Sequence, residues 1–235
     1  MSQPNILIVA AERGLGLGLT GQFLQRGWQV FATAFPGSDV SALQIAGQAA
    51  PGQLEIGHID VTDPAQIAPL LNSLGERRFD VIYLNAGIFG PLHQSVLQAT
   101  PDDFQQIMMV NAFGPIRLAR RLLPHLKVPG TLAFMSSHRG SVAANLEGGL
   151  ELYRASKAAL NMLARGIHAE IRDQGQTVLS IHPGWAATAM GTLDGAVQAE
   201  IDVETSVRGV ADVVERYRNS GESLYLDYAG ERWPW

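Results

Sequence analysis

Cysteine is absent from this 235-residue sequence. The sequence therefore offers no disulfide bond, no iron–sulfur cluster, no cysteine nucleophile and no cysteine-bound zinc ion. His93, His138 and His182 lie outside any HExxH pattern and have no carboxylate at ligand spacing, so we predict no metal site. A chain without disulfides suits a reducing compartment, and we expect a cytoplasmic protein.

Long apolar runs and targeting signals are also missing. The N-terminus lacks the basic residues of a signal peptide, and the apolar run from Ile6 to Ala11 spans only six residues. Such a run is too short for a signal peptide core or a membrane-spanning helix. The sequence therefore predicts no association with a membrane.

A surplus of positive charge is missing as well. The 17 Lys and Arg residues are outnumbered by 22 Asp and Glu residues, and the net charge is −5. This balance argues against a nucleic-acid-binding protein. With 46% apolar residues and no linker rich in Pro, Gly or Ser, residues 1–235 are predicted to form one globular domain with a sizeable core.

Short apolar runs alternate with longer amphipathic stretches along the whole chain. The runs predict strands, and the stretches predict helices closed by residues such as Gly27 and Gly175. Asp63 is a plausible N-cap. The predicted strands cover 6–10, 30–33, 54–58, 80–85, 131–136, 178–182 and 223–226. The predicted helices cover 15–26, 41–50, 64–74, 101–126 (broken near 110–111), 150–174 and 204–218. This order predicts an α/β protein, a doubly wound seven-stranded parallel sheet with helices on both faces, whose ligands bind at the carboxyl ends of the strands.

A glycine-rich turn follows the first predicted strand. Gly14 and Gly16 lie where the chain leaves the strand and opens a helix, in the order Ala10-Ala11-Glu12-Arg13-Gly14-Leu15-Gly16. Without side chains there, the backbone can approach a pyrophosphate, and the helix N-terminus offers it free N–H groups. The alternative is a helix packed closely on the sheet through its glycines.

Tyr153 and Lys157 are four residues apart on the long predicted helix. This spacing places them on one face, roughly 6 Å apart along the axis. A nearby ammonium favours the phenolate, so we expect the pKa of Tyr153 to fall toward working pH and the side chain to act as a general acid or base. The alternative for this pair is a solvated helix face.

Two further polar residues lie at ends or breaks of predicted elements. Ser136 and Ser137 follow the fifth strand, where a hydroxyl can bind a substrate oxygen. Asn111 lies where a helix breaks, and its amide can hold a water molecule or a backbone group. Serine and asparagine at such places are commonly caps, which is the alternative for each.

Taken in order, these motifs resemble the short-chain dehydrogenase/reductase superfamily, which implies a Rossmann fold. The resemblance covers nearly the whole chain and extends to Asp60-Val61, Asn85-Ala86-Gly87 and the segment from Pro183 to Thr188. Within the superfamily the chain is most similar to the C-factor and sniffer-type carbonyl reductases. The sequences around Gly27-Trp28, Tyr153 to Asn161, His182 to Trp185 and Leu226 to Trp235 support this branch.

The resemblance implies a role for each motif. Tyr153 is the general acid in carbonyl reduction and the base in alcohol oxidation, and Lys157 lowers its pKa and binds the nicotinamide ribose. Ser137 positions the carbonyl, and is preferred to Ser136 because it lies three residues before Gly140. Asn111 holds a water that relays protons from Lys157. The cofactor is expected at Ala10, Arg13, Gly14, Leu15, Gly16, Asp60, Val61, Asn85, Ala86, Gly87, Tyr153, Lys157, Pro183, Gly184, Trp185 and Thr188.

The first turn departs from the pattern of the family. Val9-Ala10 stands where the family has Thr-Gly, so Ala10 must keep a negative φ or bear strain. A reshaped turn would lower the affinity for the cofactor. Leu84 replaces the first Asn of an Asn-Asn-Ala-Gly motif, a change that we interpret as structural.

The choice between NAD and NADP depends on the end of the second strand. An acidic residue there would bind the 2′-hydroxyl of NAD, but the strand ends Thr33-Ala34-Phe35-Pro36. Arg13 can contact the 2′-phosphate of NADP, although Glu12 beside it opposes a phosphate and Arg13 is otherwise a surface residue. The sequence favours NADP(H) over NAD(H) and leaves both open.

Residues 189–203 are expected to form a lid over the substrate. Met190 and Leu193 in this segment can line an apolar pocket, whose edge Phe89, His93 and His138 can reach. Trp185 is placed either near the nicotinamide or in the core.

These features predict an NAD(P)H-dependent oxidoreductase that reduces a small or medium carbonyl compound or oxidises the alcohol. The altered turn at Val9-Ala10 leaves an alternative, a dinucleotide-binding signalling or regulatory protein with little turnover. A methyltransferase that uses S-adenosylmethionine does not explain Tyr153 and Lys157. The resemblance implies a homodimer or homotetramer formed through the helices of Asn111 and Tyr153, where Ala155, Ala158, Ala159 and Met162 permit close packing, with a second contact at residues 228–235.

Overall fold

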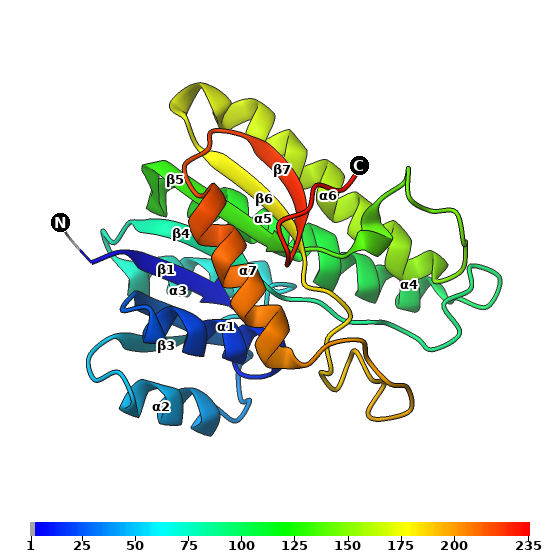
Figure 1. Cartoon of the computed structure of the whole chain (residues 1–235), viewed down its shortest axis with the longest axis horizontal. Helices are drawn as coiled ribbons and strands as arrows, with labels where there is room; N and C mark the ends of the chain where they lie inside the picture. Colours follow the sequence, from blue (N-terminus) through cyan, green and yellow to red (C-terminus); the bar gives the residue numbers. More distant parts are fainter. Residues whose placement is uncertain (1–2) are drawn as a thin grey trace.

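The computed structural model describes residues 3–235, and a parallel sheet forms the centre of this part of the chain (Figure 1). Seven strands pair in the order β3-β2-β1-β4-β5-β6-β7, and every pairing is parallel. The predicted fold class is confirmed. The strands are β1 (Asn5–Val9), β2 (Gln29–Ala34), β3 (Leu54–His58), β4 (Phe79–Leu84), β5 (Leu126–Met135), β6 (Thr177–His182) and β7 (Ser223–Asp227).

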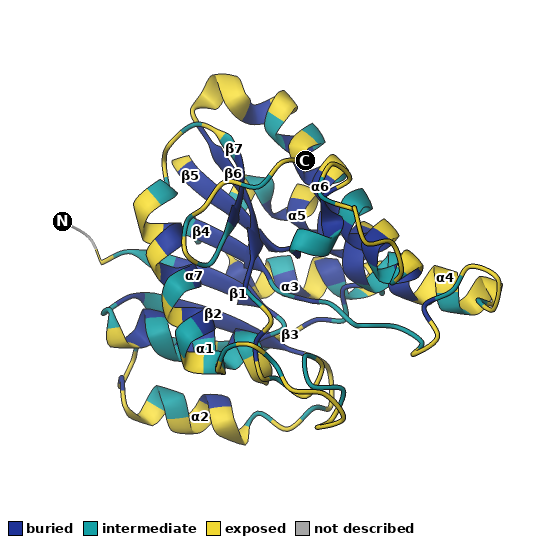
Figure 2. Cartoon of the chain, turned by 45° about the vertical axis from the view of Figure 1, so that its right-hand side comes forward, coloured by how far each residue is buried: buried dark blue, intermediate teal, exposed yellow. Residues whose placement is uncertain are grey.

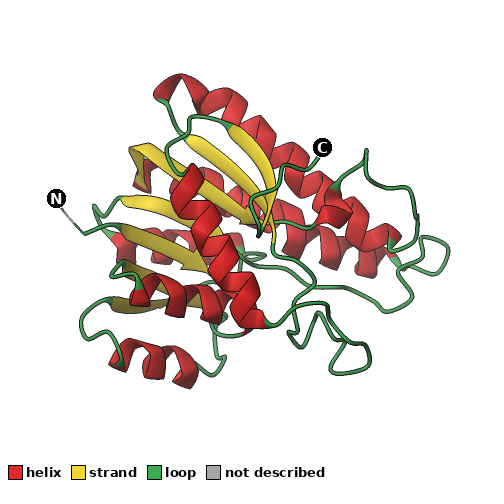
Figure 3. Ribbon diagram, in the orientation of Figure 1, coloured by secondary structure: helices red, strands yellow, loops and turns green. Residues whose placement is uncertain are grey.

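Helices cover both faces of the sheet (Figure 3). One face carries α1, α2 and α7, and the other carries α3, α5 and α6, because consecutive parallel strands need crossover connections. The helices are α1 (Gly14–Gln25), α2 (Ser41–Gln48), α3 (Ile67–Leu74), α4 (Pro101–Met108), α5 (Gly114–Leu122), α6 (Glu151–Ile171) and α7 (Val203–Tyr217). Among the described residues, no helix is long and apolar enough to cross a membrane.

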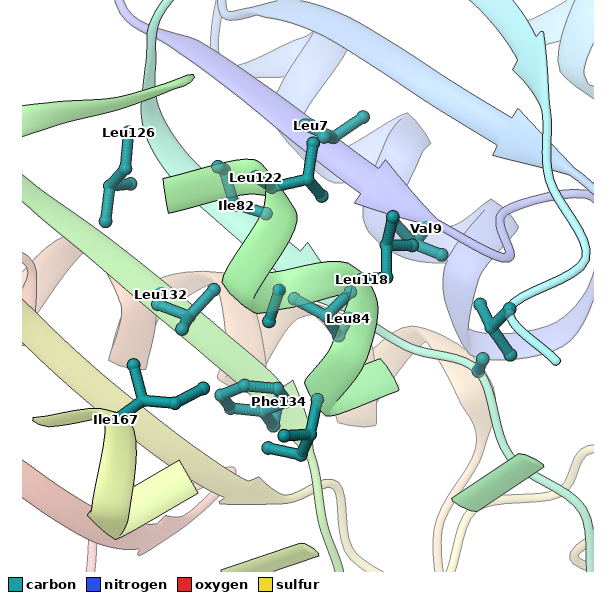
Figure 4. Packing of buried hydrophobic residues seen from close by; sticks show 14 of the residues in the cluster. Leu7, Val9, Ile82, Leu84, Leu118, Leu122, Leu126, Leu132, Phe134 and Ile167 are labelled. Carbon is teal, nitrogen blue, oxygen red and sulfur yellow. The ribbon is translucent and has the colours of Figure 1, made fainter. Parts of the chain in front are cut away.

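The strands are buried along most of their length (Figure 2), and their side chains feed two apolar layers. In the layer that α5 covers, Leu122 lies near Leu7 and Ile82, and Leu118 lies near Leu84 (Figure 4). In the opposite layer, Phe23 of α1 meets the ring of Trp28 edge-on at 5.0 Å. Strands buried on both faces explain the continuous apolar runs of the sequence.

Local signals set several boundaries as predicted. The Asp63 carboxylate accepts a hydrogen bond from the Ala65 amide at 2.9 Å and caps the turn that leads into α3. Gly175 adopts φ +73° after the turn that closes α6. Thr100 and Asp103 form a reciprocal capping box at the start of α4.

The long helix predicted over 101–126 breaks where expected and ends earlier. Met109–Phe113 forms a π-helical turn between α4 and α5, which confirms the break. However, α5 ends at Leu122, since Pro124 has no N–H to continue the helical hydrogen bonds. The strand predicted from 131 begins instead at Leu126, which pairs with Phe79, and the Lys127 ammonium lies 2.8 Å from the Asp80 carboxylate.

The strand order reverses between β1 and β4: the chain continues from β1 to β2 and β3 on one side, and from β4 to β5, β6 and β7 on the other. The connections that leave these two neighbouring strands therefore run in opposite directions and leave the carboxyl ends of the strands uncovered. A crevice opens at such a reversal in doubly wound sheets. The residues that follow β1, β4, β5 and β6 are therefore brought together at one edge of the sheet.

Candidate active site and dinucleotide cleft

A cleft of about 370 Å³ lies at this edge of the sheet. Its wall contains most of the predicted cofactor residues: Ala10, Arg13, Gly14, Leu15, Asp60, Val61, Asn85, Ala86, Gly87, Tyr153, Lys157, Pro183 and Thr188. These residues come from five separate stretches of the chain. The parallel sheet therefore brings these predicted residues together in one cleft.

Ala10 takes the backbone conformation of the glycine that it replaces. Its φ is +62°, in the left-handed region, so the residue bears strain. The Thr33 hydroxyl accepts from the Ala10 amide at 3.2 Å, and the Asn85 side-chain amide donates to the Ala10 carbonyl at 2.7 Å. These two bonds hold the turn open, and Ala10 lines the cleft rather than closing it.

The glycines of this turn allow a close backbone approach. A Cβ atom on Gly16 would overlap the Ala10 carbonyl oxygen, and Gly14 has φ +54°. The N-cap residue of α1, Arg13, makes no side-chain cap. The first N–H groups of α1 are therefore free to bind an anion such as a pyrophosphate.

Lys157 is buried beside Tyr153, and its ammonium lies 5.7 Å from the centre of the tyrosine ring. The ammonium donates to the Met135 carbonyl at 3.0 Å. Burial lowers the pKa of Lys157 to about 8, because a desolvated ammonium is disfavoured.

The expected fall in the pKa of Tyr153 is wrong for this structure. Burial raises the pKa of Tyr153 to about 12, and a hydrogen bond with the Ser137 side chain opposes the rise only in part. The phenolate loses its hydration when buried, and this outweighs the neighbouring ammonium. The phenol therefore stays protonated at neutral pH, the state that a proton donor requires.

The two serines after β5 have different partners. The Ser136 hydroxyl donates to the Asn161 side chain at 2.6 Å, whereas the Ser137 hydroxyl accepts from the Arg139 amide at 3.2 Å. The cleft wall includes Ser136 but not Ser137, and Ser137 lies close enough to the Tyr153 hydroxyl to lower its pKa. This proximity to Tyr153 agrees with the preference for Ser137, whose role stays a prediction.

Asn111 lies in the π-helical turn and is fully buried. Its side-chain oxygen accepts from the Ile88 amide at 2.7 Å, and its nitrogen donates to the Ile88 carbonyl at 2.9 Å and to the Ser156 hydroxyl at 2.9 Å. The amide thus joins the segment after β4 to α6. The role of Asn111 in a proton relay stays a prediction.

Three predicted cofactor residues lie outside the cleft wall: Gly16, Gly184 and Trp185. The Trp185 side chain is neither in the core nor in the cleft wall, since it is 40% exposed and its indole N–H donates to the Gly191 carbonyl at 2.6 Å. Gly184, at φ +77°, faces Ile201 and Tyr228. Trp185 therefore braces the segment that follows Thr188.

The cleft also contains residues that the motifs did not single out, such as Ile88 and Val110. Their positions depend on the π-helical turn and on the loop after β4, for which the sequence carries no local signal. Glu12 also lines the wall, and one of its carboxylate oxygens is buried without a hydrogen-bond partner.

A second cleft of about 610 Å³ adjoins the first and shares Gly87, Ile88 and Met190 with it. Phe89 and Leu193 line it, as predicted, and the Phe89 ring lies 5.7 Å from that of Tyr153. His93 and His138 do not line this cleft. His138 instead hydrogen-bonds His182 at 2.9 Å, and in residues 3–235 no group of three or more His, Cys, Asp or Glu side chains could hold a metal ion.

The chemistry of the cleft fits a nicotinamide dinucleotide. The free N–H groups of α1 suit the pyrophosphate, and the unpartnered Glu12 oxygen suits a ribose hydroxyl donor. A Cβ on Gly87 would come within 3.2 Å of the Lys157 ammonium, so a glycine keeps the space in front of that group clear. Fold and site thus define a dinucleotide-binding oxidoreductase.

Comparison with known proteins agrees with this class. The sequence model of the family described as "Enoyl-(Acyl carrier protein) reductase" matches residues 9–214. The chain belongs to the short-chain dehydrogenase/reductase superfamily, in the branch of the carbonyl reductases.

Two solved structures match the whole chain, and a curated relative matches two thirds of it. A short-chain dehydrogenase/reductase from Burkholderia multivorans with bound NADP is 37% identical, with a TM-score of 0.93 over 100% of both chains. A carbonyl reductase from Pseudomonas aeruginosa PAO1 in complex with NADP is 38% identical, with a TM-score of 0.90 over 100% of both chains. The C-signal of Myxococcus xanthus is 36% identical over 159 residues, which cover 66% of this chain and 92% of that protein.

The protein is an NAD(P)-dependent oxidoreductase that acts on a small molecule. The alternative of a dinucleotide-binding protein with little turnover is not favoured. The strained Ala10 that motivated this alternative leaves the cleft open.

Proposed function

We propose that the protein reduces a small or medium apolar carbonyl compound to an alcohol, with Tyr153 as the proton donor. The observation that carries this proposal is the placement of Tyr153 and Lys157 side by side in the wall of the first cleft, with the Lys157 ammonium 5.7 Å from the centre of the Tyr153 ring. Ser137 lies close enough to the Tyr153 hydroxyl to lower its pKa. A carbonyl oxygen placed between the two hydroxyls accepts from both. The carbonyl reductase activity named for the structural neighbour from Pseudomonas aeruginosa supports the same reaction.

Each residue has a separate task in this proposal. The bound dinucleotide supplies the hydride that reduces the carbonyl carbon. Ser137 orients the carbonyl oxygen, and Tyr153 transfers its proton to that oxygen as negative charge develops. Lys157 binds the ribose next to the nicotinamide and stabilises the phenolate that remains. Asn111 holds the path by which the proton is replaced.

The second cleft is the proposed site for the body of the substrate. Phe89, Pro91, Met190 and Leu193 give part of its wall an apolar surface, which favours aromatic or branched aliphatic groups. The wall also includes polar side chains, those of Arg13, Asp103, Gln106 and Asp194. Turnover of a panel of ketones, aldehydes and quinones with NADPH, followed by chromatography of the alcohols, tests the proposal. Alcohol formation from at least one apolar carbonyl is expected, and none from any member of the panel would overturn it.

We propose NADP(H) as the preferred cofactor. Arg13 lines the cleft beside Phe35, and no acidic residue ends β2 to bind a 2′-hydroxyl. The NADP bound to the relatives from Burkholderia and Pseudomonas supports this choice. Stacking of the half-exposed Phe35 ring on the adenine would add to the charge pairing made by Arg13.

A fluorescence titration with NADPH and NADH in parallel tests the preference. Arg13→Ala is expected to weaken NADPH binding about tenfold and to leave NADH binding nearly unchanged, because only the 2′-phosphate pairs with the guanidinium. Arg172→Ala, which removes a surface arginine beside Asp173, is the matched control. Equal losses for both cofactors would contradict a phosphate role for Arg13.

We further propose that residues 1–235 act as one domain in which residues 189–203 form the substrate lid. Thr188, Ala189 and Met190 line the first cleft, and Met190, Leu193 and Ala196 line the second. This segment therefore borders both clefts, which supports its proposed role as a lid over cofactor and substrate. A cytoplasmic location, proposed from the cysteine-free sequence, is tested by cell fractionation.

A homodimer or homotetramer is proposed to form through α5 and α6. Phe113 and Met162 on this face are 52% and 73% exposed, and Ala155 and Ala158 leave room for close helix packing. Size-exclusion chromatography with light scattering is expected to show a dimer or a tetramer, with Met162→Asp shifting it toward the monomer. A monomeric wild-type protein would contradict the proposal.

A further inference from the structure

The loop that carries Ser137 is bound by a residue of β7, the strand at the edge of the sheet. Ser137 is extended, with φ −158° and ψ 146°, and begins the short turn His138–Gly140. Its carbonyl oxygen accepts from the Gly140 amide at 2.8 Å and also from the hydroxyl of Tyr225. Tyr225 belongs to β7, so this second bond crosses the whole width of β6.

Tyr225 is buried, with 2% of its surface exposed. Burial raises the pKa of its phenol above the usual value, so the hydroxyl stays protonated and can donate a hydrogen bond. A buried tyrosine hydroxyl needs a partner, and the Ser137 carbonyl is that partner. Packing alone would be satisfied by phenylalanine at this place.

Residues 233–235 fold over Tyr225 and over the loop after Ser137. The Trp235 ring lies 5.2 Å from the Tyr225 ring, and the Trp233 amide donates to the Tyr225 carbonyl at 2.8 Å. The Ser141 hydroxyl donates to the Pro234 carbonyl at 2.6 Å, and the Ala143 amide donates to the Trp235 carbonyl at 3.1 Å. One segment thus binds both Tyr225 and the chain that leaves Ser137.

His138 adds a third attachment next to the serine. Its ring hydrogen-bonds that of His182 at 2.9 Å and lies 5.5 Å from the Trp233 ring, and the His182 and Trp233 rings are themselves 6.1 Å apart. His182 directly precedes Pro183, which lines the cofactor cleft. The same contacts therefore link the serine loop to the cofactor wall.

Neither Tyr225 nor any residue of 233–235 lines either cleft. We propose that Tyr225, clamped by residues 233–235, is a positioning residue that fixes the Ser137 hydroxyl against Tyr153. The inference rests on the proposed roles of Ser137 and Tyr153.

Tyr225→Phe tests the inference, since it keeps the ring and removes only the hydroxyl. The kcat for carbonyl reduction is expected to fall on the order of tenfold, because a small displacement of an orienting group lowers the rate of the chemical step. The dissociation constant for NADPH and the melting temperature are expected to stay close to wild type. Tyr217→Phe is the matched control, because the Tyr217 hydroxyl also donates to a backbone carbonyl, that of Gly230, away from Ser137.

A double-mutant cycle separates positioning from general weakening. If Tyr225 acts through Ser137, adding Tyr225→Phe to Ser137→Ala will lower kcat by less than twofold. A full tenfold additional loss would overturn the inference, as would unchanged kcat in the single variant. If Tyr225→Phe fails to fold, Trp235→Leu takes its place, because it removes the ring that stacks on Tyr225. Its kcat is expected to fall on the order of tenfold alone, and by less than about twofold when it is added to Ser137→Ala.

Failure of this inference is distinguishable from failure of the proposed function. Wild-type turnover that Tyr153→Phe abolishes and Tyr225→Phe leaves intact rejects positioning by Tyr225 alone. Turnover that survives Tyr153→Phe rejects the proposed function itself.

Discussion

Ala10 shows how a single residue departs from its family without closing the site. The backbone of Ala10 has the left-handed conformation, which strains an alanine but not a glycine. The Asn85 side chain, which donates to the Ala10 carbonyl, and the Thr33 hydroxyl, which accepts from the Ala10 amide, keep it there. The strain is thus balanced locally, and the pyrophosphate side of the cleft keeps its shape.

Replacing Ala10 with glycine should stabilise the protein. Ala10→Gly is expected to raise the free energy of unfolding by about 0.5–1 kcal/mol, because the relief of left-handed strain exceeds the loss of one partly buried methyl group. Urea denaturation followed by circular dichroism measures the change. The matched variant Ala11→Gly, at a fully buried neighbour without positive φ, should instead destabilise; equal effects of both would contradict the strain at Ala10.

The pKa of Lys157 determines how we expect cofactor binding to depend on pH. Its pKa of about 8 means that the ammonium is charged below pH 8 and progressively neutral above it. The kcat/KM for NADPH reports the free enzyme, and should therefore fall up to about tenfold per pH unit above pH 8. Tyr153, whose pKa is raised to about 12, does not titrate in this pH range. Lys157→Met should remove the fall of kcat/KM above pH 8. A wild-type profile that stays flat to pH 9.5 would contradict the assignment of this fall to Lys157.

At the scale of elements, the π-helical turn between α4 and α5 and the segment after β6 place groups that no local motif places. The turn carries Asn111 to the backbone of Ile88, and Trp185 ties its own segment to Gly191. The bond from Trp185 thereby ties the beginning of the proposed lid, at Gly191, to the chain that follows β6.

Loosening this attachment should affect the substrate more than the cofactor. Trp185→Phe removes the indole N–H that donates to Gly191, a bond worth about 1 kcal/mol. The KM for the carbonyl substrate is expected to rise about fivefold, with little change in the dissociation constant for NADPH. Steady-state kinetics and fluorescence titration measure the two quantities. The opposite pattern, weaker NADPH binding with an unchanged KM, would contradict the lid assignment.

The sequence predicted the strands best where apolar runs met clear breaks. Residues 54–58 match β3 in full, and Asp63 and Gly175 mark the boundaries that their chemistry favours. The early start of β5 was not predicted, because it depends on the contact of the Lys127 ammonium with the Asp80 carboxylate, 47 positions away in the sequence. The raised pKa of Tyr153 escaped for the same reason: burial is set by the whole fold and not by the spacing to Lys157.

At the scale of the whole molecule, the sheet brings three functions to one edge. The ends of β1 and β2 border the proposed adenosine side of the cleft, and those of β4 and β5 carry the proposed substrate and proton-transfer groups. The segment after β6 is the proposed lid, and β7 carries Tyr225, whose hydroxyl bonds to the Ser137 carbonyl. The order of the strands therefore explains why motifs scattered from Ala10 to Tyr225 act together.

The proposed chemistry depends on Tyr153 alone as proton donor, so one comparison tests the central claim most directly. Wild type and Tyr153→Phe are assayed side by side for NADPH-dependent reduction of an apolar carbonyl substrate and for NADPH binding by fluorescence. The account predicts a loss of kcat of at least about 100-fold in the variant, with the dissociation constant for NADPH within about twofold of wild type. A variant that binds NADPH and still reduces the carbonyl at the wild-type rate would contradict it.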